Sequence, residues 1–211
     1  MSQSKAIKSA TLELIRSLQE KKYLEGFYLV GGTALALYLN HRKSDDIDLF
    51  INTDFDAASL FEKIGHDFQY QLFYSAANTL KGSIGDVKVD FLAHRYPYLY
   101  KQQTVDGILM ISEQDIIAMK LNAISTSGQR SKDFIDIYYL LGRYDIGSMI
   151  NFYRSKYSQE NEAIILKSLI YFDDVDMADW PVLLTDRDLQ WEDVKIKIEE
   201  AVMRFLKSNH S

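Results

Sequence analysis

The stretch D-I-D-L-F-I, residues 46–51, constrains the fold more than any other part of the chain. Side chains alternate between the two faces of a β-strand, so Ile47 and Leu49 fall on one face while Asp46 and Asp48 fall on the other. The apolar face can join a core, and the two carboxylates then lie close together on an open face. Their mutual repulsion costs free energy unless a cation lies between them. The stretch therefore predicts a half-buried strand with a cation site on its exposed side.

The composition is that of an ordinary folded protein. Of the 211 residues, 47% are hydrophobic and 26% are charged, and there is no cysteine, which excludes disulfides and thiolate metal ligands. The N-terminus lacks the unbroken apolar core of a signal peptide, and no apolar run is long enough to cross a bilayer. We therefore expect a cytoplasmic protein without a membrane partner, large enough for one generous domain or two small ones.

The charge is unevenly distributed along the chain. The formal net charge is −6, and residues 157–211 hold 12 acidic and 6 basic side chains, whereas residues 81–132 hold 7 basic and 5 acidic ones. A polyanionic partner would be repelled by the C-terminal segment and tolerated by the middle one. This distribution argues against a broad nucleic-acid surface, but it allows a local basic cleft.

The pattern of residues divides the chain into two parts of different character. In residues 1–111, apolar periodicity, a cap at Asp56 and a Gly85-Asp86 hairpin turn predict helices that alternate with strands. The predicted helices are 5–22, 33–39 and 56–65, and the predicted strands are 27–30, 46–51, 68–73, 79–84, 87–93 and 107–111.

From Ser112 onward the pattern is helical. Ser112 and Asp115 have the spacing of a capping box before an apolar stripe, and a second helix carries Phe134 and Ile137. Further helices are expected at about 146–156, 160–170 and 188–207. We therefore predict an α+β fold, with a mixed sheet and flanking helices in residues 1–111 and an all-helical domain in residues 112–211.

A third acid and a glycine pair extend the predicted cation site. In the strand 87–93, Asp90 lies on the face opposite the apolar residues, so Asp46, Asp48 and Asp90 can together hold one or two Mg²⁺ ions. Residues 31–33, Gly-Gly-Thr, stand between a strand and a helix, where backbone amides and a helix N-terminus favour phosphate. A glycine pair alone is usually a turn, and D-x-D alone is often a solvated strand end, so it is their combination that points to nucleotide chemistry.

This combination is the signature of the polymerase-β-like nucleotidyltransferases, and the chain resembles one family among them more narrowly. It is similar to the AbiEii/AbiGii toxins, the nucleotidyltransferase-like toxins of bacterial type IV toxin–antitoxin and abortive-infection systems. The resemblance covers nearly the whole chain and is carried by the stretches GGTALALYLNHRKSDDIDLF, VKVDFL with YPYL, ISEQDIIAMKLNAI, RSKDFIDIYYLL and YFDDVD…W…WEDVK.

The resemblance implies a role for each matching residue. It implies a polymerase-β-like fold for the N-terminal half, completed by a helical half, and a reaction that moves a nucleoside monophosphate from an NTP to an acceptor. The residues and their implied roles are Gly31, Gly32 and Thr33 at the triphosphate, Asp46 and Asp48 at Mg²⁺, Arg42 and Ser44 in the loop or at phosphate, Lys120 at the nucleotide, and Asp133 and Asp136 as base or ordering acids.

The residues themselves leave some of these roles open. Lys120 lies on an apolar helical stripe, where it either extends to the surface or meets an anion. Asp133 and Asp136 share a helix face, which is also what a solvated acidic face looks like. The resemblance implies a secondary role for Asp90 at the metal, and Asp45 is expected to remain in the loop. Tyr96 and Tyr98 are candidates for stacking a base.

Three functions remain in competition at this point. The first is nucleotidyl transfer to RNA, which by resemblance includes tRNA, with a neighbouring antitoxin that restrains the toxin. The second is transfer to a small molecule or to a protein hydroxyl, which the acidic C-terminal segment favours because tRNA binding needs a basic surface. The third is a nucleotide-binding module without turnover.

Overall fold

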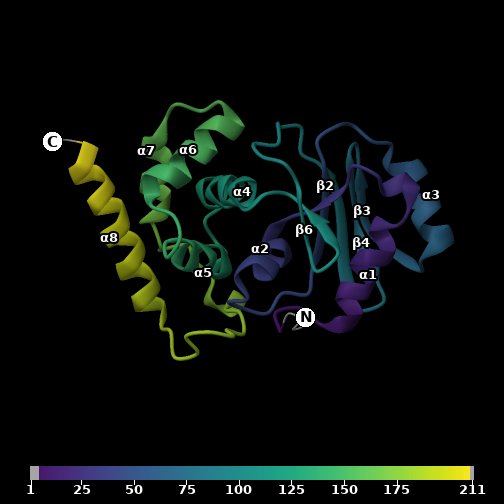
Figure 1. The fold of residues 1–211 in the computed structure, drawn as a ribbon, viewed down its shortest axis with the longest axis horizontal. Coiled ribbons are helices and arrows are strands. Elements are labelled where there is room, and N and C mark those ends of the chain that lie inside the picture. Colours follow the sequence, from purple (N-terminus) through teal and green to yellow (C-terminus); the bar gives the residue numbers. More distant parts are fainter. Residues whose placement is uncertain (1–4, 210–211) are drawn as a thin grey trace. The chain divides into compact units, whose positions relative to one another are not determined.

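The computed structural model describes residues 5–209, and the chain divides into two compact units, Met1–Ser112 and Glu113–Ser211. Unit 1 is built around a seven-stranded mixed sheet (Figure 1). Its strands are β1 (Tyr28–Leu29), β2 (Ile47–Ile51), β3 (Tyr70–Ala76), β4 (Thr79–Ile84), β5 (Val87–Ala93), β6 (Gln103–Val105) and β7 (Ile108–Met110), in the order β3-β4-β5-β2-β1-β7-β6.

The pairing of β2 determines where the acids lie. It runs parallel to β5 with Asp48 opposite Asp90, and antiparallel to β1 with Leu49 opposite Leu29. The strand pairs β3–β4, β4–β5 and β6–β7 are antiparallel, while β1 and β7 are parallel. The α+β class with a mixed sheet is thus confirmed, and the predicted neighbourhood of the Asp48 and Asp90 strands is correct.

Helices lie on both sides of this sheet. The helices of unit 1 are α1 (Ser9–Gln19), α2 (Gly31–Leu39), α3 (Ala57–Asp67) and a short 3₁₀ turn, η1 (Lys22–Leu24). In Figure 1, α1 and α3 lie on the same side of the sheet and α2 lies on the other. Phe61 of α3 packs on Tyr70, and Tyr70 packs on Phe91 of β5. Since Phe91 points toward α3, the alternation places Asp90 on the opposite side, here called the open face.

The core beneath α1 and α3 explains why these strands form. Leu29, Leu49, Leu80, Val89 and Phe91 are fully buried, and they are the apolar members of alternating strands. The hairpin between β4 and β5 forms at Gly85-Asp86 as predicted, with Ile84 opposite Val87. The cap of α3 is also confirmed, because the Asp56 carboxylate accepts hydrogen bonds from the backbone amides of Ala58 and Ser59.

Several elements of unit 1 differ from the prediction. The helix expected over 5–22 is limited to α1, with η1 after it, and the strand expected over 68–73 is β3, three residues longer at its end. Strand β6 was not expected, although its turn with β7 is Asp106-Gly107, where both residues have positive φ, as a type I′ hairpin turn requires. Helix α2 begins at Gly31 rather than at Thr33, so that both glycines lie in its first turn.

Unit 2 is helical, as predicted. It contains α4 (Glu113–Thr126), α5 (Ser131–Leu140), α6 (Ile146–Tyr157), α7 (Glu162–Leu169), the 3₁₀ turn η2 (Met177–Asp179) and α8 (Trp191–Asn209). Eight of the 14 residues of α4 are buried, and α4 is joined to α6 by an ion pair between Asp115 and Lys156 at 2.7 Å. Among residues 5–209 no helix has both the length and the apolar character needed to span a membrane.

We predict that Gly82 is essential for the packing of the sheet on Tyr70. A Cβ at Gly82 would stand 2.2 Å from the carbonyl oxygen of Gln71 and 2.6 Å from the Tyr70 ring, whose hydroxyl donates to the carbonyl of Val89. Backbone cannot give way cheaply, so Gly82→Ala should lower the free energy of unfolding by about 1–3 kcal/mol or more. Urea unfolding measures this change.

The matched control is Gly65→Ala in α3, where a Cβ would meet nothing within 4 Å. Removal of a helical glycine at an open position should raise stability by about 0.5–1 kcal/mol. Equal effects of the two substitutions would show that the close packing at Gly82 has been misread.

Candidate active site

The two glycines at the start of α2 are required for different reasons. Gly31 has a φ of +71°, and a Cβ there would stand 2.7 Å from Oδ2 of Asp48. A Cβ at Gly32 would stand 2.5 Å from Nη2 of Arg42. The backbone at the N-terminus of α2 therefore passes directly beside an acid and a guanidinium. Any side chain at either position would push one of these charged groups away.

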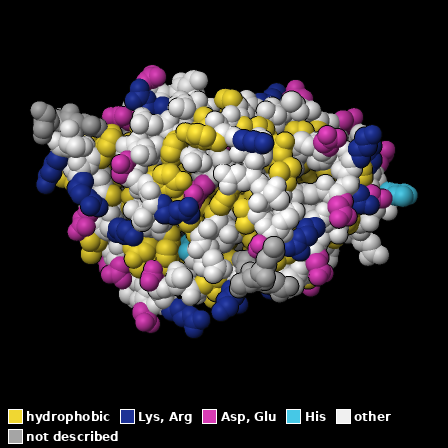
Figure 2. All heavy atoms as spheres, in the orientation of Figure 1, with side chains coloured by type: hydrophobic (Ala, Val, Ile, Leu, Met, Phe, Trp, Pro, Cys, Tyr) yellow, Lys and Arg dark blue, Asp and Glu magenta, His cyan; other side chains and the backbone are white. Residues whose placement is uncertain are grey.

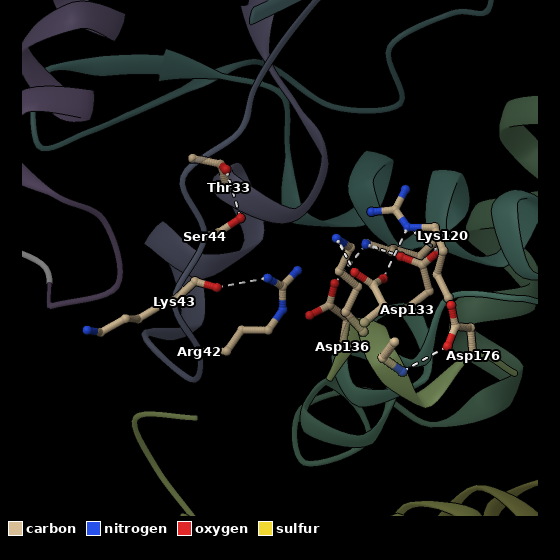
Figure 3. Close-up of polar contacts among 12 residues, drawn as sticks. Thr33, Arg42, Lys43, Ser44, Lys120, Asp133, Asp136 and Asp176 are labelled. Carbon is tan, nitrogen blue, oxygen red and sulfur yellow. Dashed lines mark hydrogen bonds and ion pairs between the residues drawn. The ribbon is translucent and has the colours of Figure 1, made fainter. Parts of the chain in front are cut away.

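Thr33 fastens the loop that carries the acids onto α2. Its side chain is buried at 1% exposure, and its hydroxyl donates to the backbone carbonyl of Asp46. The same hydroxyl lies 2.9 Å from Oγ of Ser44 (Figure 3). Both side chains predicted for phosphate thus make contacts within the protein. The position of Asp46 depends on these contacts across 13 residues of sequence.

The three acids of unit 1 differ in exposure. Asp46 is exposed, Asp48 is half-buried and Asp90 is buried. The parallel register of β2 and β5 places Asp48 and Asp90 side by side on the open face. One oxygen of Asp90, Oδ2, lies 3.1 Å from Nζ of Lys88, whereas the buried Oδ1 has no hydrogen-bond partner among the described residues. Asp45 lies apart from this set in an exposed ion pair with Lys8.

Lys88 is a cation that the sequence analysis did not single out. Burial acts to lower the pKa of its ammonium, but the hydrogen bond to Asp90 and the charge of that carboxylate outweigh it. The charges of Asp48 and Asp46 act in the same direction, so the pKa of Lys88 is raised above its ordinary value. Strand alternation from Asp90 could have placed Lys88 on the open face, although a lysine near a strand end usually indicates only solvation.

These residues have the donor chemistry that a hard divalent cation needs. Carboxylate oxygens are its preferred ligands, and the Oδ1 of Asp90 is available to accept a partner. In the described part of the chain, however, no three His, Asp or Glu side chains converge in a ready-made metal site. The side chains therefore fit the predicted Mg²⁺ in kind, with Asp48 and Asp90 as the in-register pair, while a third ligand would have to come from Asp46 at the strand end.

Arg42 belongs to the wall of this site. It is 2% exposed, it lies against Gly32, and its Nη1 donates to the backbone carbonyl of Lys43 at 3.1 Å (Figure 3). A buried guanidinium beside a helix N-terminus adds positive charge where phosphate is favoured. In unit 1 the structure therefore brings together the predicted glycines, Thr33, Arg42, Ser44 and the acids.

Unit 2 contains the remaining predicted residues in a cluster of their own. Nζ of Lys120 lies 2.5 Å from Oδ1 of Asp133 and 2.7 Å from Oδ2 of Asp136 (Figure 3). The three side chains are 7%, 6% and 0% exposed. Lys120 therefore does not extend to the surface, and the two acids do not form a solvated face. The ammonium of Lys120 neutralises one of the two carboxylate charges, and Arg130 lies 3.8 Å from the Asp133 carboxylate.

Further contacts tie this cluster to the segment before α8. Arg130 lies 3.8 Å from both Asp133 and Asp179, and Lys132 pairs with Asp179 at 2.8 Å. The backbone amide of Asp176 donates to the carbonyl of Gln129. These contacts were not predicted from the sequence, because Asp176 and Asp179 are more than forty residues away from the start of α5.

We predict that Lys120 is essential for the stability of unit 2. Lys120→Met would leave the carboxylates of Asp133 and Asp136 buried together without their cation. Removal of one partner from a buried charge group typically costs about 3–5 kcal/mol. Chemical denaturation should therefore show a loss of this size.

The control is Lys132→Met, because Lys132 makes a similar ion pair whose side chains are 23% and 32% exposed. A pair that water still reaches contributes much less than a fully buried one, about 1 kcal/mol, so this variant should unfold nearly as the unaltered chain does. A comparable loss in both variants, or none in either, would contradict the assignment of Lys120 as the buried counter-ion.

Comparisons of sequence assign the chain to a family. The model of the family described as "Nucleotidyl transferase AbiEii toxin, Type IV TA system" matches residues 13–69 and 63–205. The uncharacterized protein aq_aa25 of Aquifex aeolicus (strain VF5) is 31% identical over 188 residues, which cover 86% of this chain and 89% of that protein.

Comparisons of structure agree on the fold. MenT4, a nucleotidyltransferase toxin of Mycobacterium tuberculosis H37Rv, superimposes with a TM-score of 0.63 at 12% identity, over 91% of this chain and 81% of that one. JHP933 of Helicobacter pylori gives a TM-score of 0.53 at 14% identity, over 97% of each chain. At such low identity these likenesses show the fold alone, and the sequence match determines the family. The chain belongs to the AbiEii family, the nucleotidyltransferase toxins of type IV toxin–antitoxin systems.

Proposed function

We propose that this nucleotidyltransferase depends on Mg²⁺ and moves a nucleoside monophosphate from an NTP to a hydroxyl group of an acceptor. The observation that carries the proposal is the in-register pair Asp48 and Asp90, with Gly31 at the start of α2 in contact range of the same Asp48 carboxylate. The arrangement combines two needs of phosphoryl transfer, namely acids for a metal ion and backbone amides for phosphate.

Each residue of unit 1 has a defined part in this proposal. The backbone of Gly31 and Gly32 receives the triphosphate at the N-terminus of α2, and Arg42 adds positive charge beside it. Asp46 and Asp48, with Asp90, hold Mg²⁺. When bound, the ion screens the triphosphate and lowers the pKa of the attacking hydroxyl. Thr33 and Ser44 keep the loop of Asp46 on α2 rather than binding phosphate themselves.

The reaction balances without a further reactant. The acceptor oxygen forms a bond to the α-phosphorus, and the bond from that phosphorus to the oxygen bridging to the β-phosphorus breaks. Pyrophosphate leaves, and the acceptor carries the nucleoside monophosphate. The hydroxyl proton passes to a carboxylate of the site.

For unit 2 we propose that Lys120 binds a phosphate group of the nucleotide. Its position between Asp133 and Asp136 keeps the ammonium charged and fixed in direction, so these acids act as positioning residues. A general-base role for either acid is less favoured, because both carboxylates contact Lys120.

The acceptor and the setting are inferred from the family. A toxin of this kind has an antitoxin as its partner, and we propose RNA, with tRNA as the first candidate, as the acceptor in the cytoplasm. Acidic and basic side chains are interspersed on the face shown in Figure 2, so no broad basic surface supports RNA binding there. A small molecule or a protein hydroxyl is therefore the second candidate acceptor, and the net charge of −6 favours it.

The experiment that tests this function is label transfer from each of the four α-³²P-labelled NTPs, with Mg²⁺ present and absent. Total RNA, total protein and an aminoglycoside serve as separate acceptors. Label on RNA supports the first candidate, and label on protein or drug supports the second. If the protein binds NTP but transfers label to none of the acceptors, the proposed transfer is wrong and the protein is a nucleotide-binding module without turnover.

We predict that Asp48→Asn and Asp46→Asn each lower label transfer by roughly 100-fold or more, since metal assistance contributes several kcal/mol to the barrier. Both variants should remain folded, because they remove repulsion between carboxylates. Asp45→Asn is the control, since this neighbouring acid pairs with Lys8 outside the site. Equal activity of the Asp45 and Asp48 variants would contradict the metal assignment.

We predict that Thr33→Val raises the Mg²⁺ concentration needed for half-maximal activity and lowers the free energy of unfolding by about 1–3 kcal/mol. Valine keeps the shape but loses the hydrogen bond to the Asp46 carbonyl. Thr33→Ser keeps the hydroxyl and should resemble the unaltered enzyme. If Thr33→Val has an unchanged metal requirement, Thr33 does not position Asp46.

A further inference from the structure

Aromatic side chains continue the open face of the sheet beyond the acids. In β2 the alternation that exposes Asp48 also places Phe50 on this face, about 7 Å further along the strand. Tyr28 of β1 is the register partner of Phe50. His94 follows β5 directly, and its backbone amide donates to the carbonyl of Ile51.

These side chains form one contiguous surface. The ring centroids of Phe50 and His94 are 6.1 Å apart, those of His94 and Tyr96 are 4.8 Å apart, and those of Tyr28 and Tyr98 are 5.3 Å apart. We call the five residues Tyr28, Phe50, His94, Tyr96 and Tyr98 the aromatic platform. None of them is fully buried, and Tyr96 is 42% exposed, so the platform has ring surface left to offer.

Basic side chains occur in the same chain segment as His94, Tyr96 and Tyr98 of the platform. The segment 88–101 contains the basic residues Lys88, Arg95 and Lys101, and Asp90 is its one acid. Lys88 lies at the glycine end of β5, where it pairs with Asp90. Arg95, between His94 and Tyr96, is 65% exposed and pairs with Asp54 at 3.2 Å. Aromatic rings alternating with cations are the pattern that binds single-stranded nucleic acid, where bases stack and phosphates pair with the cations.

The position of the platform relative to the acids indicates which base it receives. Strand β1 leads from Tyr28 to Gly31 and runs antiparallel to β2, so the glycines lie beyond the Asp48 end of this strand pair and Phe50 lies toward the other end. In an in-line displacement the attacking oxygen and the leaving pyrophosphate are on opposite sides of the phosphorus. With the triphosphate tail at the glycines, the attacking hydroxyl comes from the side of the platform.

We propose that the aromatic platform binds the terminal nucleobase of a single-stranded nucleic-acid acceptor and holds its hydroxyl next to Asp48 and Asp90. This inference rests on the proposed nucleotidyl transfer, and it adds the site that receives the acceptor. A strand end of this kind fits the local basic segment although the whole chain is acidic.

Equilibrium binding tests the platform without any turnover. The probes are a fluorescein-labelled single-stranded RNA decamer with a free 3′-hydroxyl, followed by anisotropy, and each NTP, followed by calorimetry. The variant is Tyr96→Ala, which removes an exposed ring, and Tyr96→Phe should restore binding. The control is Tyr74→Ala, because Tyr74 is 55% exposed on the same sheet but on edge strand β3, three strands from β2.

Tyr96→Ala should weaken RNA binding roughly 5- to 100-fold and leave NTP binding unchanged, since one stacked base contributes that much. Tyr74→Ala should change neither. The proposal is overturned if Tyr96→Ala binds the RNA as tightly as Tyr74→Ala does, if it weakens NTP binding instead, or if the unaltered protein binds no single-stranded RNA. RNA binding that depends on Tyr96, without label transfer to any acceptor, would retain the platform and refute the proposed function.

Discussion

The repulsion between carboxylates on one face of a sheet is the constraint on which the structure of unit 1 depends. Parallel pairing of β2 with β5 brings Asp48 and Asp90 together, and Asp46 lies two residues before Asp48 on the same face. The apolar residues between them make this unavoidable, because Ile47, Leu49 and Phe91 must face the core. The fold therefore concentrates negative charge at one place, and Lys88 responds with a raised pKa. Carboxylates that attract the ammonium of Lys88 are also suited to bind a divalent ion together with a triphosphate.

In unit 2 the charges are arranged the other way round: a buried cation is surrounded by carboxylates. There the cation, Lys120, is buried, and Asp133 and Asp136 compensate its charge from one helix. Asp115 and Lys156 repeat the arrangement deeper in the helical core, at 0% and 1% side-chain exposure. Such pairs contribute little net stability, but each is costly to break, so they fix the helices in one arrangement. Lys120 is thereby held in a defined direction, which is what phosphate binding needs.

The sequence predicted those parts of the site that depend on local pattern. The alternation of residues 46–51 placed the acids, and the glycines marked the turn into α2, because both follow from backbone geometry over a few residues. The hydrogen bond from Thr33 to the Asp46 carbonyl was not predictable, since it joins residues brought together only by tertiary packing. Strand β6 was missed because three residues carry little periodicity, although its Asp106-Gly107 turn was a usable signal.

The account depends on a metal ion at the carboxylates of β2 and β5, next to the first turn of α2. The most direct measurement is anomalous scattering from crystals grown with Mn²⁺ and a non-hydrolysable NTP analogue. Anomalous density within bonding distance of Asp46 and Asp48, with the analogue's phosphates at the amides of Gly31 and Gly32, is the predicted result. Density for the metal and the nucleotide away from these carboxylates, with Lys88 still paired to Asp90, would contradict the account.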